Sequence, residues 1–326
     1  MLDFRSRKDV RLLTRREFLR ENGGLILSSM LALDATKLLA YNALKEPQVE
    51  KRNVNPKMQY RRLGRTNLMV SILGMGGALN YGPDSLNDDP AKITRLLDKA
   101  LETGINYFDT SPDYNTEDNF AHLASKREQC FIATKVNTVS AEGVRSEVEN
   151  SLRTMKTDYI DIVQTHYKPI EDDWSGILES LNELQKLKAE GKVRFVGFTH
   201  HDCNKLKRAL TSHSDLIDTV LLLYSFHTEH LGAEEIITLA HSRDIGVIAM
   251  KAFMGGYESW AERIKEWKSD PTNWARISPL IGKDTSIAQA CLKYVLRNME
   301  VSTAIVGMRT IEEINENSAV PRTVMF

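Results

Sequence analysis

Cysteine is scarce in this sequence of 326 residues: Cys130, Cys203 and Cys291 lie far apart and form no C-x-x-C pair. This excludes a disulfide scaffold and gives no sign of a cysteine-ligated metal or iron–sulfur cluster. The 43 basic and 44 acidic side chains nearly balance, so we expect no broad electrostatic grip on nucleic acid. With 18 glycines and 9 prolines, the chain is neither collagen-like nor of low complexity.

The apolar run near the N-terminus is too short to cross a bilayer. Residues 23–33 (GGLILSSMLAL) are 11 uncharged residues, whereas a membrane-spanning helix needs about 20. Such a run suits the h-region of an export signal. The residues before it, Thr14-Arg15-Arg16-Glu17-Phe18-Leu19-Arg20, resemble the S/T-R-R-x-F-L-K consensus of twin-arginine (Tat) signals. We therefore expect residues 1–44 to be a Tat-like signal or anchor, read by the Tat export machinery, and the protein to be periplasmic or membrane-attached.

The alternative for this segment is an amphipathic helix that packs on the body of a cytoplasmic protein. Asp34 and Lys37 interrupt the apolar pattern, and no clean A-x-A cleavage site follows it. Residues 45–57 (KEPQVEKRNVNPK) are polar and contain two prolines, which predicts a linker. Residues 58–326 are then the folded domain.

This domain repeats a pattern of strand followed by helix. Short apolar runs, typical of strands buried on both faces, are found at Val70–Gly74, Ile105–Asp109, Cys130–Val136, Ile160–His166, Val193–Thr199, Thr219–Tyr224, Gly246–Met250 and Thr303–Val306. A helical pattern follows nearly every run. The first begins at an aspartate cap, Asp88 or Asp89, with Pro90 near its first position, and ends at Gly104. Eight such units predict a (β/α)8 TIM barrel of the α/β class.

A doubly wound sheet is the competing fold. It would require a G-x-G-x-x-G turn after the first strand, but Gly74-Met75-Gly76-Gly77-Ala78-Leu79 has leucine in place of the third glycine. An excursion over residues 253–285 interrupts the seventh unit and carries Trp260, Trp267 and Trp274. It is either a lid or pocket wall at the catalytic end of the barrel, or a segment that its tryptophans attach to the body.

Four polar residues follow or end neighbouring predicted strands, where barrel enzymes place their chemistry. They are Asp109, Tyr114, Lys135 and His166. A buried lysine needs a partner, and Asp109 can supply it. A lysine beside Tyr114 would lower the pKa of the phenol and make it a proton donor, while His166 could orient a carbonyl oxygen. Each residue alone has an ordinary structural interpretation, but four at adjacent strand ends favour an active site.

These residues and their surroundings resemble the aldo-keto reductase family. The resemblance runs from Tyr60-Arg61-Arg62-Leu63-Gly64-Arg65-Thr66 to Glu316-Asn317 and includes Thr134-Lys135 and the stretch from Asp109 to Tyr114. It implies a (β/α)8 fold and reversible hydride transfer between NAD(P)H and a carbonyl. It also implies that Tyr114 is the general acid/base, Lys135 lowers its pKa, Asp109 holds Lys135 and His166 orients the substrate.

The same resemblance implies a set of cofactor contacts at strand ends. They are Gly76, Thr199, His200, Tyr224, Met250, Lys251, Gly307, Met308, Arg309, Glu316 and Asn317. The family usually has Ser-Asn where Thr199-His200 stands, often has glutamine at the position of Leu221, and often has an aromatic residue at that of Met250. These departures affect the residues that would hold the nicotinamide.

Arg309 could pair with a 2′-phosphate through two hydrogen bonds, so NADP(H) is favoured over NAD(H). Its alternative role is a surface ion pair with Glu312 or with Glu313, which occupies a position where many NADP-preferring members have arginine. No metal is expected.

We therefore expect an NAD(P)H-dependent oxidoreductase that reduces aldehyde or ketone carbonyls to alcohols reversibly, with aldehydes, small ketones, sugars and quinone-like carbonyls all open as substrates. The alternative is a barrel that binds a nucleotide as a sensor, or binds a partner, as the potassium-channel β-subunit relatives do. The residues do not specify the substrate or the oligomeric state.

Overall fold

A computed structural model describes residues 48–80, 85–86, 89–166, 174–228, 231–254 and 260–320. The chain divides into two units, residues 1–48 and 49–326, and the second contains the barrel. The Tat-like segment 1–44 lies outside the described residues, so the export prediction stays a prediction. Among the described residues, no helix is long and apolar enough to span a membrane.

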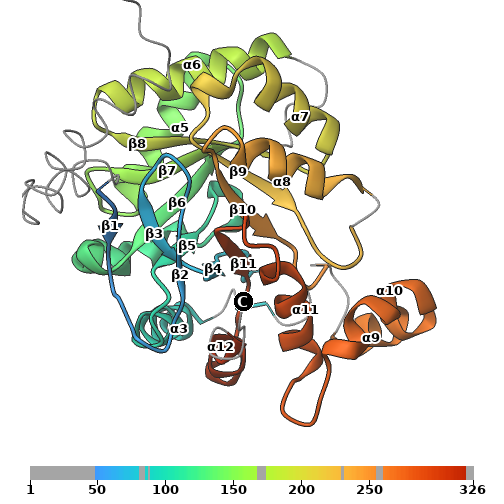
Figure 1. The fold of residues 1–326 in the computed structure, drawn as a ribbon. Coiled ribbons are helices and arrows are strands. Elements are labelled where there is room, and N and C mark those ends of the chain that lie inside the picture. The colour runs from blue at the N-terminus through green and yellow to red at the C-terminus, as the bar shows by residue number, and fades with distance from the viewer. Residues whose placement is uncertain are drawn as a thin grey trace, which may run out of the picture. The chain divides into compact units, whose positions relative to one another are not determined.

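Eight parallel strands close into a barrel in the order β4-β5-β6-β7-β8-β9-β10-β11, with β11 pairing back to β4 (Figure 1). The barrel strands are β4 (Leu73–Gly76), β5 (Tyr107–Asp109), β6 (Phe131–Val136), β7 (Ile160–Thr165), β8 (Val193–His200), β9 (Thr219–Leu223), β10 (Gly246–Met250) and β11 (Thr303–Val306). The predicted (β/α)8 TIM barrel is confirmed. Because all the strands are parallel, their carboxyl ends lie at one rim.

Helices surround the barrel and cover its outer face (Figure 1). The α-helices are α3 (Pro90–Glu102), α4 (Glu117–Phe120), α5 (Ala141–Thr154), α6 (Trp174–Ala189), α7 (Cys203–Ser212), α8 (Ala233–His241), α9 (Trp260–Ser269), α10 (Pro271–Ile277), α11 (Ile287–Leu296) and α12 (Ile311–Ser318). Short 3-10 helices are η1 (Pro112–Tyr114), η2 (Ala121–Gln129), η3 (Ser214–Leu216) and η5 (Ser278–Leu280). Helix α3 begins as predicted, with the Asp89 side chain accepting from the Lys92 backbone N–H.

The first predicted strand, Val70–Gly74, differs from the observed structure. It joins the end of β3 (Leu68–Ser71), which pairs antiparallel with β2 (Tyr60–Arg62), to the start of β4. Since both strands are buried, their apolar residues read as one run. The chain turns at Ile72, where the Ser71 hydroxyl donates to the Leu73 carbonyl oxygen (2.7 Å). The β2–β3 hairpin packs Leu63, Leu68 and Val70 into a cluster with inward residues of the barrel.

The predicted linker, 45–57, is partly secondary structure. Glu50–Lys51 forms β1, which pairs parallel with β3. Arg52 then donates to the carbonyl oxygens of Arg127 (2.8 Å) and Cys130 (2.7 Å). Charge explains why this polar segment is ordered, because Glu50 and Arg52 both join the ion-pair network around the buried Asp161. A polar composition alone could not distinguish this role from that of a linker.

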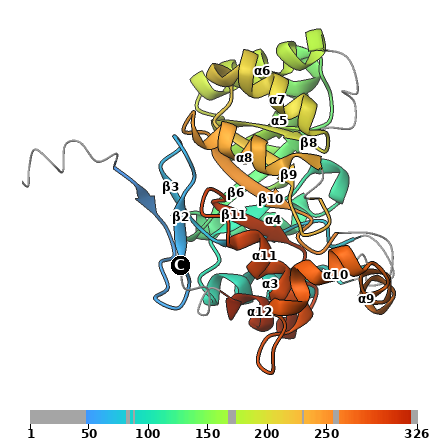
Figure 2. The same ribbon diagram turned by 45° about the vertical axis from the view of Figure 1, so that its right-hand side comes forward.

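The excursion over 253–285 contains α9 and α10, which lie at the opposite side of the barrel from the β2–β3 hairpin (Figure 2). Trp267 is only 1% exposed and packs edge-on against Phe226 at 5.1 Å between ring centroids. Arg276 donates to the Phe226 carbonyl oxygen (2.9 Å). The excursion therefore attaches to the loop after β9, and Trp267 makes the packing contact. Trp260 is 38% exposed.

Candidate active site

A buried ion pair lies at the rim where the barrel strands end. Asp109 is the last residue of β5 and Lys135 is the fifth residue of β6; they are 1% exposed each. Lys135 Nζ donates to Asp109 Oδ1 (2.5 Å) and to the Thr110 carbonyl oxygen (2.8 Å). The apolar neighbours of β6 fix this arrangement, since they force the strand into the barrel wall and carry the lysine with it.

Burial disfavours the ammonium, but the carboxylate of Asp109 and the neighbouring Tyr114 outweigh it and raise the pKa of Lys135. Lys135 is therefore cationic at neutral pH. Burial also raises the pKa of Asp109, against the opposing effect of Lys135. The site thus holds a buried lysine–aspartate ion pair in a dry environment, where charges act most strongly.

Tyr114 lies above this pair, as the last residue of the 3-10 helix η1. Lys135 Nζ is 5.0 Å from the centre of the Tyr114 ring. The imidazole of His166 packs edge-on against the same ring, with centroids 6.3 Å apart. The four residues singled out in the sequence therefore meet at one place, from β5, β6, the end of β7 and η1.

His166 directly follows β7 and is 3% exposed. Its Nδ1 lies 2.6 Å from Asn137 Oδ1 and 3.7 Å from Asp113 Oδ1. The sequence analysis did not single out Asn137 or Asp113. Both lie close to a predicted site residue, Asn137 two residues after Lys135 and Asp113 one residue before Tyr114, so nearness to the motif was the available signal.

Gln164 is a further residue that the sequence analysis missed. It is fully buried, its Nε2 donates to Asp109 Oδ2 (2.8 Å), and its Oε1 accepts from the Thr199 hydroxyl (2.7 Å). Gln164 thus links the ion pair to β8. The signal was its spacing, because residue 164 lies two before His166 on the strand and faces the same side.

The predicted cofactor residues that surround the rim come from several strands. Gly76 ends β4, Met250 ends β10 and packs against the cluster inside the barrel, and Lys251 follows it with a φ of 58°. Gly307 to Arg309 follow β11. The Arg309 guanidinium reaches the loop after β4, 3.4 Å from the Leu79 carbonyl oxygen.

Two predicted cofactor residues turn away from the barrel interior. Tyr224 is fully buried in the layer between barrel and helices, and its hydroxyl donates to Glu234 (3.0 Å) on α8. His200 stacks on Phe198, 6.4 Å between centroids, and its Nδ1 accepts from the Asp202 N–H. The adjacent Thr199 faces Gln164 instead. Successive strand residues face opposite sides, so the Thr199-His200 pair can present only one side chain inward.

The segment after β11 is suited to a nucleotide. A Cβ at Gly307 would meet only one atom within 4 Å, Leu79 Cδ2 at 3.7 Å, so its backbone stands beside open space. Asn317 is 3% exposed, and its Oδ1 has no hydrogen-bond partner among the described residues. A buried amide oxygen without a partner is costly, and a ligand amine would satisfy it. These two features fit the phosphate and base of a nucleotide.

One carboxylate lies beside the predicted phosphate site. Glu313 Oε2 accepts from the Arg309 backbone N–H (2.5 Å) at the start of α12, whose N-cap is Thr310. Backbone N–H groups at this position are the donors an anion would use. Glu313 therefore competes for a donor that a cofactor phosphate would need. Glu313, one of the two partners in the surface alternative for Arg309, thus contacts its backbone N–H.

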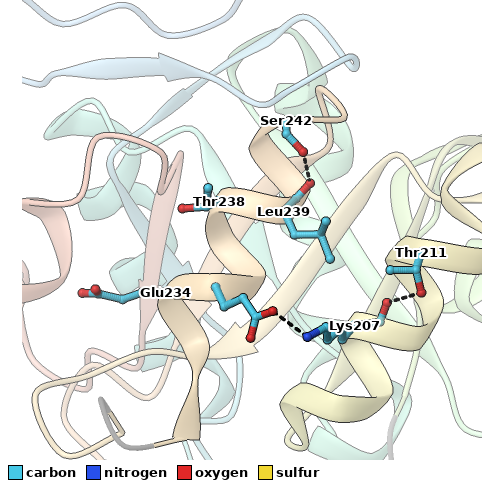
Figure 3. A pocket seen from close by; sticks show the side chains of 7 residues that line it. Lys207, Thr211, Glu234, Thr238, Leu239 and Ser242 are labelled. Atoms are coloured by element: carbon cyan, nitrogen blue, oxygen red, sulfur yellow. Dashed lines mark hydrogen bonds and ion pairs between the residues drawn. The ribbon is translucent and has the colours of Figure 1, made fainter.

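A separate open groove lies on the outside, between α7 and α8 (Figure 3). Its volume is about 520 Å³, and the ion pair of Lys207 with Glu235 (2.6 Å) crosses it. None of the predicted site residues lines it. We place the chemistry at the strand ends and not in this groove.

Comparison with known proteins agrees with this geometry. The sequence profile of the Aldo/keto reductase family matches residues 73–324. This chain belongs to the aldo/keto reductase family. The match spans the whole barrel, from β4 past α12, and places the protein among oxidoreductases.

Individual relatives cover most of the chain. L-galactose dehydrogenase of Arabidopsis thaliana is 29% identical over 286 residues, 81% of this chain and 88% of that protein. The NADH-specific methylglyoxal reductase of Escherichia coli is 25% identical and covers 79% and 91%. Among solved structures, the holo form of an aldo-keto reductase from Bacillus halodurans superposes with a TM-score of 0.67 at 25% identity, covering 82% and 92%.

Proposed function

We propose that this protein is an NAD(P)H-dependent carbonyl reductase that converts small aldehydes or ketones to alcohols, reversibly. The observation that carries the proposal is the buried Lys135–Asp109 pair beneath the Tyr114 ring. A cation held 5.0 Å from that ring favours the phenolate, and this makes the phenol a better proton donor to a substrate oxygen.

Each residue then has a role in the reaction. When bound, the nicotinamide supplies the hydride to the carbonyl carbon. Tyr114 gives its phenolic proton to the carbonyl oxygen, and Lys135 stabilises the phenolate that results. His166 orients the oxygen. Asp109 keeps Lys135 cationic and in place. In the reverse direction the phenolate takes the alcohol proton.

The test is turnover by the purified full-length chain with a panel of aldehydes and ketones, beside Tyr114→Phe. We expect the rate of NAD(P)H oxidation to fall by about 100-fold or more in the variant, because general acid catalysis contributes about 10²–10⁴-fold. Equal rates in the two proteins would refute the role of Tyr114.

For the cofactor we propose NADP(H), with the 2′-phosphate on Arg309. Gly307, Met308 and Asn317 would hold the rest of the nucleotide, and Glu313 would leave the Arg309 N–H when phosphate binds. The relative from Escherichia coli is named for NADH, so the binding of NADPH and of NADH must be measured side by side. Arg309→Ala should weaken the binding of NADPH by about 10–100-fold, the value of a charge-assisted hydrogen bond, with little change in the binding of NADH. Glu313→Gln should tighten the binding of NADPH. Equal effects on both cofactors would contradict this assignment.

A second candidate is a nucleotide-binding sensor or partner-binding barrel. It is favoured by the altered contacts around the nicotinamide, where His200 and Tyr224 face the helices. Tight NADP(H) binding without turnover on any carbonyl in the panel would move the assignment to this function.

For location we propose Tat export through residues 1–44, on the twin-arginine motif alone. Because Tat systems carry folded proteins, the cofactor could travel already bound and would then leave slowly. A green fluorescent protein fusion of residues 1–57 should leave the cytoplasm, and Arg15→Lys/Arg16→Lys should keep it there. A fusion that stays inside without these changes would overturn the proposal, and rapid nucleotide exchange would rule out the captive cofactor.

A further inference from the structure

Two residues outside the four-residue set hold the His166 ring. Asn137 lies in the loop after β6, and its Oδ1 is 2.6 Å from His166 Nδ1. Asp113 lies in η1, and its Oδ1 is 3.7 Å from the same nitrogen. Both contacts come from oxygen atoms and reach the same side of the ring.

These two residues are themselves fixed. The backbone N–H of Asn137 donates to Glu147 Oε2 (2.5 Å), which comes from α5. The carboxylate of Asp113 accepts from the Ser111 hydroxyl, and Pro112 begins the 3-10 turn between them. A ring held by two anchored oxygens cannot turn without breaking both contacts.

The contact with Asn137 Oδ1 determines the protons on the imidazole. Nδ1 must carry a hydrogen in order to donate to an amide oxygen. In a neutral ring, Nε2 is then a lone-pair acceptor. A carbonyl oxygen is also an acceptor, so Nε2 can donate to it only when the ring carries a second proton. The nearby Asp113 carboxylate favours that imidazolium form.

Among the described residues, Asp113 and Tyr114 from η1 contact the His166 ring. Three further charged residues lie one contact away: Lys135 from β6 beside Tyr114, Asp109 from β5 beside Lys135, and Glu147 from α5 beside Asn137. Asp109 already neutralises Lys135, and of the carboxylates that the structure describes Asp113 is the nearest outside that pair, 3.7 Å from Nδ1. It is the one whose removal should change the proton on the ring.

We propose that Asp113 and Asn137 are positioning residues, which hold His166 as an imidazolium with Nε2–H directed to the carbonyl oxygen. This inference rests on the proposed carbonyl reduction. It predicts that kcat/KM for reduction falls as pH rises, when the ring loses its second proton. It also predicts opposite effects of two nearly isosteric changes. Asp113→Asn removes a negative charge beside the ring, and Asn137→Asp adds one.

The experiment measures kcat/KM for NADPH-dependent reduction of 4-nitrobenzaldehyde from pH 5 to 9, with the full-length chain. Asp113→Asn should move the midpoint of the fall to lower pH by about one unit, and Asn137→Asp to higher pH by about one unit, as expected for one charge within about 4–6 Å. His166→Gln should remove the fall that follows the ring and leave only the fall that follows loss of the Tyr114 proton. Circular dichroism checks that each variant is folded.

A purely structural role would lower activity in both variants without moving the midpoints apart. Midpoints that move together, or stay in place, would overturn the proposal, as would an unchanged fall in His166→Gln. If the parent protein reduces no carbonyl, the proposed function fails instead. The titration of His166 is then followed by NMR of protein labelled with ¹⁵N-histidine, assigned by the signal missing from His166→Gln, and the same opposite shifts are required.

Discussion

Replacing Lys135 by methionine should destabilise the fold strongly, and by an amount that depends on pH. The substitution keeps the apolar stem but removes the ammonium from Asp109, which is 1% exposed. Breaking a buried ion pair in this way costs about 3–5 kcal/mol. The carboxyl can escape by taking up a proton. At pH 7, protonating a group with an ordinary pKa near 3.9 costs about 4 kcal/mol, which is the same size.

The pH dependence has a definite sign. In Lys135→Met the folded state keeps a proton on Asp109 that the unfolded state loses above about pH 4, so the folded state binds more protons. Its stability relative to the parent protein therefore rises as the pH falls, by about 1.4 kcal/mol for each unit. Between pH 7.0 and pH 5.5 the penalty should shrink by about 2 kcal/mol.

The assay is urea unfolding of the full-length chain, followed by circular dichroism at both pH values. The matched control is Lys135→Met with Asp109→Asn, which keeps an acceptor for Gln164 and removes the charge. It should recover most of the lost stability at pH 7 and show no extra pH dependence. A single-variant penalty below about 1 kcal/mol, or one equal at both pH values, would refute the buried-charge argument.

Three further predictions concern other parts of the barrel. Gly64→Ala should cost about 2–4 kcal/mol, because Gly64 has a φ of +49° and a Cβ there would lie 2.2 Å from a backbone nitrogen of β10; a normal urea midpoint would contradict this. Asp161→Asn should cost about 3–5 kcal/mol, because this buried carboxylate pairs with arginines at 2.5 and 2.6 Å; an unchanged melting temperature would refute that network. Burial raises the pKa of Cys130 and of Cys291 to about 12, so a thiol reagent at pH 8 should label only Cys203 until the protein is unfolded; fast labelling of three thiols would show that the two are accessible.

The sequence alone determined the barrel. Short apolar runs and period-3.6 patterns are local, so the strand and helix positions could be read from short windows. The boundary at Val70–Gly74 was wrong for a related reason: two buried strands in succession have the same apolar composition, and only the pairing of β3 with β2 separates them. The strand at Glu50–Lys51 was likewise not predicted, because the ion-pair partner of Glu50, Arg194, lies far along the chain.

The four-residue set could also be predicted to meet, because strand ends of a parallel barrel share a rim. The direction of individual side chains could not. Thr199 and His200 are neighbours in the sequence, yet one bonds to Gln164 inside the barrel and the other stacks on Phe198 outside it. Which of the two faces inward depends on the register of β8 against β7 and β9.

The contacts that position the His166 ring likewise depend on the tertiary structure. Asn137 follows β6 and Asp113 lies in η1, and their nearness to the motif residues does not show that both contact the histidine. The local sequence indicates where each strand lies, because a buried strand requires apolar side chains along its whole length. A contact between loops depends on the few ångströms and the angle at which the closed barrel brings their ends together, and that geometry exists only after the chain has folded.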